Sequence, residues 1–341
     1  MASNPTYISI IVPVYNNPKD LLECLSALKA SFLPDSEIIV VDDASTDDIA
    51  SIGALMGVRL FRLTRNSGPA AARNYGTRQA QGEIFFFVDA DVALAPGAVH
   101  RVRRVFEAPP DLAAVFGSYD ARPRAKGLVS QYRNLLHHFV HQNGNPDAST
   151  FWAGCGAIRR SVFEETGGFD EARFPRPSIE DIELGYRLRR AGHRILLDKG
   201  LQGTHLKKWT LWSLLRTDIM HRAVPWSRLI LESKRPVHEL NLKPGQRLSC
   251  ALVGLAIAFL LLAPLRIEML VLSAAALLGV VVVNQELYAF FFRRRGFLFA
   301  LACIPLHFLY YLYTGLSYLI VWIDIQLRGT TTGGASAVGR V

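Results

Sequence analysis

The chain has 341 residues, half of them hydrophobic, and a formal net charge of +9. This length allows one large domain or two smaller ones. The positive charge does not indicate a nucleic-acid partner, because the basic residues form no single stripe. Many of them lie close to the apolar C-terminal third: Lys207, Lys208, Arg216, Arg222, Arg228, Lys234, Arg235 and Arg293–Arg295. Next to membrane segments, anionic lipid is the better partner for such cations.

Strand-like and helix-like segments alternate through the first half of the chain. The expected strands are Tyr7–Val14, Glu37–Val41, Val58–Leu63, Ile84–Val88 and Leu112–Phe116. The expected helices are one that starts at Pro18 with Asn17 as its cap, then Pro69–Gln81 and Pro96–Phe106. This order predicts an α/β fold with a doubly wound, mostly parallel sheet and helices on both faces. The almost wholly apolar Ile84–Val88 is expected at its centre.

Polar side chains follow three of these strands at the point where each strand ends. The sequence Tyr15-Asn16-Asn17 follows the first, Asp42-Asp43 the second and Asp89-Ala90-Asp91 the fourth. A single Asp after a strand is usually a turn residue or a helix cap. Ligands of such sheets bind at the carboxyl ends of the strands, so three polar clusters at this edge predict a binding site.

Asp89 and Asp91 are the strongest candidates for metal binding. In an extended segment their side chains project the same way, and two adjacent carboxylates repel each other unless a cation lies beside them. A hard ion such as Mg²⁺ or Mn²⁺ suits oxygen ligands and also binds substrate phosphates. We therefore expect these residues to hold a divalent metal against a nucleotide diphosphate, although Asp-x-Asp alone is also frequent in ordinary loops.

Several other side chains allow both a functional and a structural interpretation. Asp43 either accepts a hydrogen bond from a nucleobase or belongs to a helix start capped by Ser45 or Thr46. Arg73, near the flexible turn at Gly68, either binds phosphate or lies on a solvated helix face. The small residues Gly154-Cys155-Gly156-Ala157 predict a loop that approaches a ligand closely.

Further along, Ile179–Leu188 is predicted to be a helix. Glu180 and Asp181 lie at its start, where the helix dipole favours anions, so they are either a matched cap or a general base. His205 follows the predicted strand Arg194–Leu197 and is a candidate for completing the metal shell. A lone histidine is more often structural.

The motifs taken together resemble family 2 glycosyltransferases over roughly residues 7–210. The motifs, in chain order, are Val12-Pro-Val-Tyr-Asn-Asn17, Val40-Val-Asp-Asp-Ala-Ser-Thr-Asp47, Asn66-x-Gly68, Ala72-Arg-Asn-x-Gly76, Asp89-Ala-Asp91, Gly167-Gly-Phe-Asp170 and Glu180-Asp181. The resemblance implies a GT-A fold and a UDP- or GDP-sugar donor, with Mg²⁺ or Mn²⁺ as cofactor. It also implies a single in-line displacement with inversion.

The resemblance also assigns residues. It places the nucleotide-sugar at Pro13, Tyr15, Asn16, Asp43, Gly68, Arg73, Asp89 and Gly154, the metal at Asp89, Asp91 and His205, and catalysis at Asp181 with Glu180. Asp181 is then the base that takes the proton from the acceptor hydroxyl. If the acceptor is a lipid phosphate, it is already ionised and needs no strong base.

Processive members of the family carry a Gln-x-x-Arg-Trp signature, which the corresponding stretch His221–Trp226 lacks. We therefore expect the transfer of one sugar at a time. A subunit of a processive polysaccharide synthase and a non-catalytic nucleotide-sugar-binding scaffold are the alternatives.

Three long apolar runs follow residue 245: Leu248–Leu265, Ile267–Val283 and Phe297–Ile323. The first approaches the roughly 20 residues that cross a bilayer, the second is marginal, and the third is long enough to cross with tilt. Pro305 is a possible kink in the third. Buried core helices are the alternative.

We expect a catalytic domain over 1–206, an amphipathic interfacial segment over 207–245, about three transmembrane helices within 246–328 and a disordered tail over 329–341. A second amphipathic candidate is Gly127–His141, whose three histidines lack carboxylate support for a metal. No signal peptide opens the chain, and the four cysteines are scattered. These features predict a cytosolic catalytic domain at a membrane, such as the bacterial inner membrane, and a lipid-linked acceptor.

Overall fold

The computed structural model describes residues 7–107, 111–233 and 243–333. The chain divides into two compact units, Met1–Thr210 and Leu211–Val341. Each unit is described below by itself.

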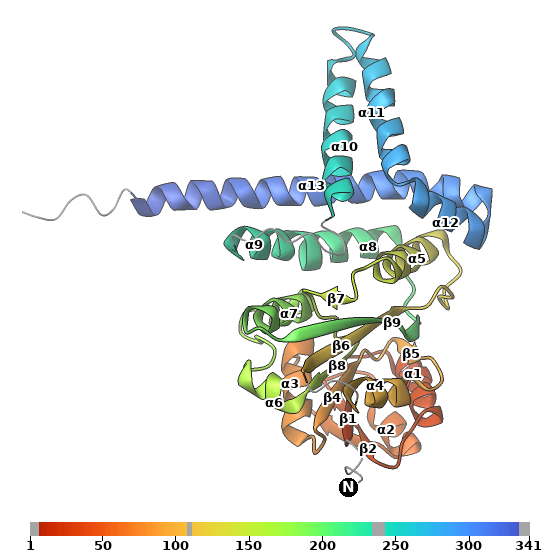
Figure 1. Cartoon of the computed structure of the whole chain (residues 1–341), viewed down its shortest axis with the longest axis vertical. Coiled ribbons are helices and arrows are strands. Elements are labelled where there is room, and N and C mark those ends of the chain that lie inside the picture. Colours follow the sequence, from red (N-terminus) through yellow and green to blue (C-terminus); the bar gives the residue numbers. More distant parts are fainter. Residues whose placement is uncertain (1–6, 108–110, 234–242, 334–341) are drawn as a thin grey trace, which may run out of the picture. The chain divides into compact units, whose positions relative to one another are not determined.

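The described part of the first unit is built on a nine-stranded sheet in the order β3-β2-β1-β4-β8-β6-β9-β5, with β7 paired to β9 (Figure 1). Its strands are β1 (Ile8–Val14), β2 (Ser36–Asp42), β3 (Arg59–Arg62), β4 (Ile84–Val88), β5 (Val92–Leu94), β6 (Leu112–Tyr119), β7 (Asp147–Ala148), β8 (Cys155–Arg159) and β9 (Arg194–His205). The strands β3, β2, β1 and β4 are parallel neighbours. The predicted doubly wound, mostly parallel arrangement is confirmed for this half, and β4 is central as expected.

The helices of this unit are α1 (Pro18–Ala30), α2 (Ala50–Met56), α3 (Pro69–Gln79), α4 (Ala98–Glu107), α5 (Leu128–Gln142), α6 (Arg160–Glu165) and α7 (Glu180–Arg190). The start of α1 follows the predicted signals: Asn17 accepts a hydrogen bond from the Asp20 amide and Pro18 occupies the first turn. Its apolar face is buried through Leu21, Cys24, Leu25 and Leu28. That burial attaches the helix to the sheet.

One expectation about this unit is wrong. Gly154–Ala157 was expected to be a loop, but Cys155 begins β8, which runs antiparallel between β4 and β6. The small residues have a packing reason, because a Cβ on Gly156 would lie 2.4 Å from the Trp152 carbonyl oxygen. Since Cys155 pairs with Val88, the start of β8 lies at the carboxyl end of β4.

Strand β9 is longer than expected and ends at His205 instead of Leu197. It is parallel to β6, so its last residues lie at the same edge as the carboxyl end of β6. The short strand β5 pairs antiparallel with this end, Val92 opposite His205. This pairing brings the segment after Asp91 against His205.

The second unit is helical in its described residues. Its elements are α8 (Leu211–Asp218), the π-helical turn η1 (Ile219–Ala223), α9 (Val224–Ser233), α10 (Pro244–Leu262), α11 (Met269–Val283), α12 (Gln285–Arg295) and α13 (Phe297–Gly333). Helix α13 includes Pro305. It also includes the first residues of the tail predicted to be disordered, Gly329–Gly333, and residues 334–341 of that tail lie outside the described residues.

Among the described helices, α10 and residues Phe297–Arg328 of α13 are long and apolar enough to cross a membrane. The second predicted run forms α11, which has 15 residues and is shorter than these two helices. It reaches a comparable length only as the pair α11–α12, which is bent by 67° at Asn284. The expected three spans are thus two, or three if the bent pair counts as one.

Candidate active site

Arg73 connects three elements at the carboxyl edge of the sheet. Its side chain on α3 is buried, and its two terminal nitrogens donate to Asp89 Oδ1 at 2.7 Å and to Glu180 Oε1 at 2.8 Å. Burial opposes the charge of the guanidinium, but the two carboxylates raise its pKa above the usual range. Arg73 is therefore a fixed cation between the end of β4 and the start of α7, and not a solvated residue on a helix face.

Asp91 and His205 come together as candidate metal ligands. Asp91 Oδ2 lies 3.7 Å from His205 Nε2, and the Leu206 amide donates to the Asp91 carbonyl at 2.8 Å. The ring of Tyr119 stacks on His205 with centroids 4.1 Å apart. Burial opposes ionisation of Asp91, but the hydrogen bond and charge of His205 and the charge of Lys207 hold its pKa below the usual range.

No group of three or more His, Cys, Asp or Glu side chains with a metal-ligand arrangement occurs in the part of the chain that the structure describes. Mg²⁺ and Mn²⁺ sites of nucleotide-dependent enzymes commonly use one or two carboxylates, with substrate phosphates and water completing the shell. One carboxylate beside an imidazole fits that chemistry. Asp91 with His205 is therefore a suitable pair of protein ligands for such an ion.

Asp89 faces Arg73 and only partly faces solvent. Its side chain is 32% exposed, and its backbone amide donates to the Gly154 carbonyl at 3.2 Å. Burial and the neighbouring Asp91 raise the pKa of this carboxyl group, against the lowering effect of Arg73. Gly154 must lack a side chain, because a Cβ there would lie 2.6 Å from the ring of Trp152.

Asp181 stands apart from these ion pairs. The amides of Ala153 and Ile182 donate to its carboxylate at 3.1 and 2.8 Å. Burial, with the adjacent Glu180, raises its pKa to about 7, although Arg73 lowers it. A carboxyl group whose pKa lies near neutrality is suited to take and release a proton.

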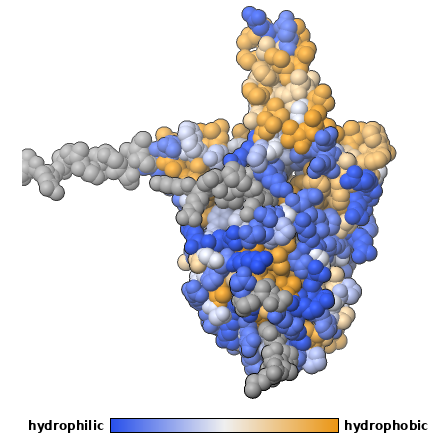
Figure 2. All heavy atoms as spheres, viewed as in Figure 1, coloured by the Kyte–Doolittle hydropathy of each residue, from blue (hydrophilic) through white to orange (hydrophobic). Residues whose placement is uncertain are grey.

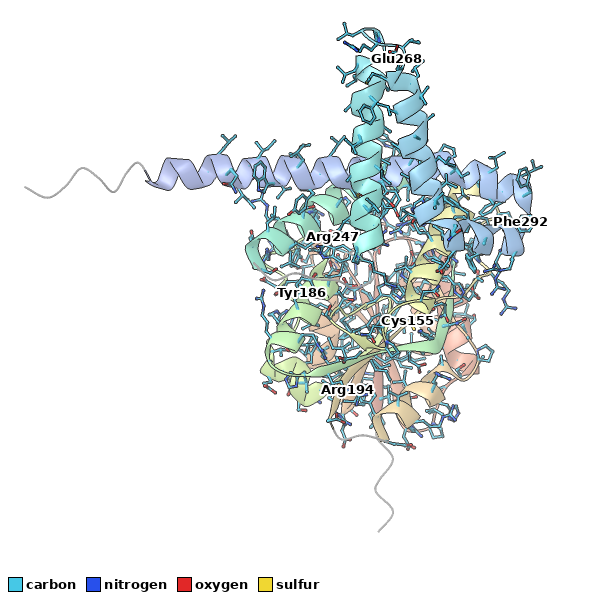
Figure 3. All side chains as sticks on the ribbon, turned by 45° about the horizontal axis from the view of Figure 1, so that its top comes forward. Cys155, Tyr186, Arg194, Arg247, Glu268 and Phe292 are labelled. Carbon is cyan, nitrogen blue, oxygen red and sulfur yellow. The ribbon has the colours of Figure 1, made fainter. Side chains whose placement is uncertain are left out.

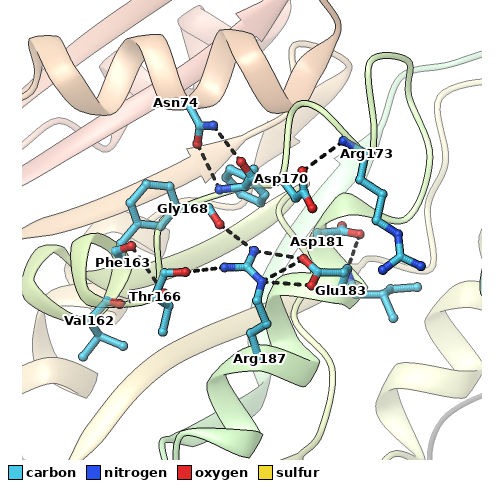
Figure 4. A network of polar contacts seen from close by, with 12 residues as sticks. Asn74, Val162, Phe163, Thr166, Gly168, Asp170, Arg173, Asp181, Glu183 and Arg187 are labelled. Carbon is cyan, nitrogen blue, oxygen red and sulfur yellow. Dashed lines mark hydrogen bonds and ion pairs between the residues drawn. The ribbon is translucent and has the colours of Figure 1, made fainter. Parts of the chain in front are cut away.

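A second network holds the start of α7 in place, and no motif of the sequence marked its central residue (Figure 4). Arg187 donates to Glu183 at 2.9 Å, to the Gly168 carbonyl at 2.6 Å and to the Thr166 carbonyl. Asn74, the neighbour of Arg73, donates to the Phe169 carbonyl at 2.8 Å and accepts from the Phe169 amide at 3.0 Å. The Gly-Gly-Phe-Asp turn is therefore tied to both α3 and α7. The spacing of Glu183 and Arg187 by four residues was the available signal.

Asp43 is satisfied by backbone donors. The amides of Ser67 and Gly68 donate to its two oxygens at 2.7 and 2.8 Å, and burial raises its pKa. Gly68 has φ +88°, and a Cβ there would lie 2.6 Å from the Pro175 carbonyl oxygen. Asp43 thus shapes the turn at Gly68. This role is independent of any hydrogen bond between its remaining lone pairs and a nucleobase.

The remaining predicted donor-site residues lie around the end of β1. Pro13 lies within β1 opposite Val41, and Tyr15 is 51% exposed just beyond its end. The side-chain oxygen of Asn16 accepts from the amides of Thr46 and Asp47 at 2.8 and 3.2 Å. Asn16 therefore braces the loop after β2, and Tyr15 is the exposed ring of this group.

An aromatic cluster adjoins the metal-ligand pair and was not anticipated. The ring centroid of Trp152 lies 4.8 Å from those of both Tyr119 and His137, and His137 lies 3.9 Å from His141. Two of the three histidines of α5 thus pack in this cluster. A lone Trp in a loop carried no pattern that could have placed it here.

Comparison with known proteins agrees with this geometry. Residues 9–167 match the family model described as glycosyl transferase family 2. The pre-mycofactocin glycosyltransferase of Mycobacterium tuberculosis is 28% identical over 205 residues, covering 57% of this chain and 42% of that protein. An uncharacterized glycosyltransferase of Haemophilus influenzae is 30% identical over 193 residues, covering 53% of this chain and 61% of that protein. The chain thus spans less than two thirds of the length of each of these relatives.

A solved structure shows the same fold. The mannosyltransferase of Pyrobaculum calidifontis, in complex with GDP-Man and Mn²⁺, aligns with a TM-score of 0.56 at 18% identity over 94% of this chain and 87% of that one. The fold and the acidic edge of the sheet define a glycosyltransferase domain of the GT-A type. More particularly, residues 9–167 carry the domain of glycosyl transferase family 2.

Proposed function

We propose that the protein transfers a single sugar from a UDP- or GDP-sugar to a membrane-associated, lipid-linked acceptor, with a divalent metal and inversion at the anomeric carbon. The observation that carries the proposal is the bridge by Arg73 between Asp89 and Glu180. It connects a strand end that bears a candidate metal ligand to the helix start that bears a candidate base.

The donor would bind along the carboxyl ends of β1, β2 and β4. The exposed ring of Tyr15 is available to stack near the base, and Asp43 lies at the neighbouring strand end. Asp91 and His205 would hold Mg²⁺ or Mn²⁺, with Asp89 beside them. When bound, the ion neutralises charge on the departing diphosphate. The GDP-Man and Mn²⁺ of the P. calidifontis enzyme support this class of donor and ion.

The two acidic residues that begin α7 have different roles in this proposal. Glu180 accepts from Arg73 on one oxygen and from the Ser178 amide on the other, at 2.8 and 3.0 Å. Both its oxygens are occupied, so it would orient the helix start. Asp181 accepts hydrogen bonds from the backbone amides of Ala153 and Ile182, and burial raises its pKa to about 7. Asp181 would therefore take the acceptor proton as the anomeric carbon is attacked from the opposite side to the diphosphate.

The second unit supports an acceptor in the bilayer. Two of its described helices are long and apolar enough to span a membrane. Together with the missing Gln-x-x-Arg-Trp signature, this favours transfer to a membrane lipid one sugar at a time. We place the protein in a membrane, such as the bacterial inner membrane, with its catalytic domain in the cytosol.

The full chain in detergent or liposomes tests the proposal. Release of nucleoside diphosphate is measured for a panel of UDP- and GDP-sugars with Mg²⁺, Mn²⁺ or chelator, with and without a lipid extract. We expect one or a few donors to turn over only with metal and faster with lipid. Asp91→Asn should lower turnover at a fixed, limiting metal concentration, whereas Asp147→Asn, which changes an exposed partner of Arg189, should not.

Binding of a sugar nucleotide without turnover in any combination would instead support a non-catalytic scaffold. Repeated addition of sugar to one acceptor molecule would support a processive synthase. Either result would overturn the proposal of single-sugar transfer.

A further inference from the structure

Helix α13 has its polar and apolar faces reversed relative to a helix of a water-soluble domain. Its buried side includes His307, Tyr311, Tyr313 and Ser317. Its exposed side carries an apolar stripe whose members recur at helical spacing: Leu301, Leu316, Leu319, Ile323 and Leu327, each more than 40% exposed. A helix that buries polar groups and exposes such a stripe requires an apolar surrounding.

The buried face of α13 is covered by a charged partner. Residues 211–233, the continuous helical stretch α8–η1–α9, include five charged side chains: Arg216, Asp218, Arg222, Arg228 and Glu232. Tyr313 donates to Asp218 at 2.7 Å and Arg228 donates to Asp324 at 2.8 Å. The stretch from Tyr313 to Asp324 is about 16 Å of helix, so α13 runs along this partner for about three turns.

A helix with five charges does not lie in the hydrocarbon of a bilayer. Because α8–η1–α9 must lie at headgroup level, residues 313–324 of α13 lie there too. The C-terminal half of α13 thus cannot be the crossing segment that its length and composition allow.

The contacts of the N-terminal half of α13 with α12 likewise indicate that this half lies outside the hydrocarbon. Asn284, at the bend before α12, donates to Ser249 at 2.9 Å and accepts from Tyr311 at 2.8 Å, so the bend lies level with the start of α10. From there α12 and α13 run alongside each other, with Tyr288 on His307 and Phe291 on Phe299. Helix α12 ends in three exposed arginines, Arg293–Arg295. If this pair pointed into the bilayer, its arginines would enter the hydrocarbon.

The hairpin α10–α11 is different. Between Arg247 and Arg266 it has 18 residues with no charge, and between Glu268 and Glu286 it has 17. These segments rise by about 28 and 27 Å, close to the hydrocarbon thickness of roughly 30 Å. Arg247 lies near its base and Glu268 near its tip (Figure 3), and its surface is largely apolar (Figure 2). Helix α13 contacts the hairpin near its base, where Cys250 lies 3.7 Å from Thr314 and Tyr311 packs against Val253 and Val280 (Figure 1).

We propose that only α10–α11 crosses the bilayer, and that α12 and α13 lie in its cytosolic interface with the outer apolar stripe of α13 in the lipid. Two crossings return the chain to the side on which it entered. Residues 297–333 would therefore lie on the same side as the catalytic domain. This arrangement rests on the membrane location given in the proposed function, but it does not require that the protein transfer a sugar.

Nitroxide labels on the full chain in liposomes test this arrangement. Leu301→Cys and Ile323→Cys lie on the same exposed stripe, and Leu255→Cys lies midway along the hairpin and serves as the deep reference. The chain without these three substitutions, whose Cys24, Cys155 and Cys303 are buried, gives the background labelling of its native cysteines. We expect labels 301 and 323 at the same depth, accessible to oxygen and shallower than label 255.

A spanning α13 would separate the two labels by about 33 Å of helix rise and would overturn the proposal. Labels reached by an aqueous nickel reagent but not by lipid-dissolved oxygen would overturn it too, and would indicate a water-filled or protein-covered surface. Protease protection of N- and C-terminal tags in sealed vesicles gives an independent result. We expect cleavage of both tags from the same side, and cleavage from opposite sides would refute the two-crossing topology. Neither measurement requires turnover, so a failure of the proposed activity would be recognised separately.

Discussion

Changing Asp181 to Asn tests the assignment of the base most directly. The substitution keeps the size of the side chain and removes its ability to take a proton. A positioned general base contributes about 10²–10⁴-fold, so we expect donor turnover to fall within that range. Asp147→Asn is the matched control, because its carboxylate is exposed and pairs with Arg189.

The pH dependence follows from the same residue. With a pKa of about 7, Asp181 is only about 1% ionised at pH 5. Hydrolysis of the donor, with water as acceptor, should therefore rise about 100-fold from pH 5 to pH 9 in the unmodified protein. The Asn variant should show little of this rise. With a lipid phosphate as acceptor the dependence should be weaker, because that nucleophile is already ionised.

Stability provides a check that the variant is folded. Burial raises the pKa of Asp181 from the ordinary aspartate value of 3.8 to about 7 in the folded chain, so the folded state holds the proton more tightly. The unmodified protein thus loses stability as pH rises between these values, by at most about 4 kcal/mol, and the Asn variant does not. Urea unfolding should find the variant at least as stable at pH 8. A turnover loss of less than threefold, or a flat profile in the unmodified protein, would refute the assignment.

Three further predictions concern the site and its support. Asp91→Asn should weaken the apparent affinity for Mn²⁺ by at least about tenfold, measured by titrating metal at fixed donor, since a ligand is lost. Arg187→Met should lower the free energy of unfolding in urea by about 2–4 kcal/mol, because Glu183 and the Gly168 carbonyl lose their donor. Arg160→Met breaks an exposed ion pair with Glu164 and should lower it by less than about 1 kcal/mol. Equal costs for the two variants would refute the role given to Arg187. Gly117→Ala should lower the free energy of unfolding by about 3 kcal/mol or more, because its Cβ would lie 2.0 Å from the Leu201 carbonyl oxygen. A Cβ on Gly127 would meet no atom within 4 Å, so Gly127→Ala should leave the free energy of unfolding nearly unchanged.

The strands and helices of the first half could be predicted because their signals are local. The apolar run Ile84–Val88 and the cap at Asn17 each depend on residues a few positions apart. The position of the acidic residues at strand ends could be predicted too, since the carboxyl ends of parallel strands share one edge of the sheet for any conformation of the loops. Strand β8 was missed because Cys155-Gly156-Ala157 has no alternation of polar and apolar residues.

The second unit shows what composition alone does not reveal. Length and hydropathy treat α13 as a candidate span, although its buried side includes polar residues that meet neighbouring helices, such as Tyr313 on Asp218, and its apolar stripe is exposed. That distinction depends on which face each neighbouring helix covers, and hydropathy averaged over a window does not record it.

The sequence by itself determined the chemical groups of the candidate site and the edge of the sheet at which they gather. Only the tertiary structure decided how they pair. Arg73 meets Glu180 across 107 positions, and Asp91 meets His205 because β5 pairs antiparallel with the end of β9. Such pairings depend on strand order and register, which are set by the packing of the whole sheet and not by any local pattern.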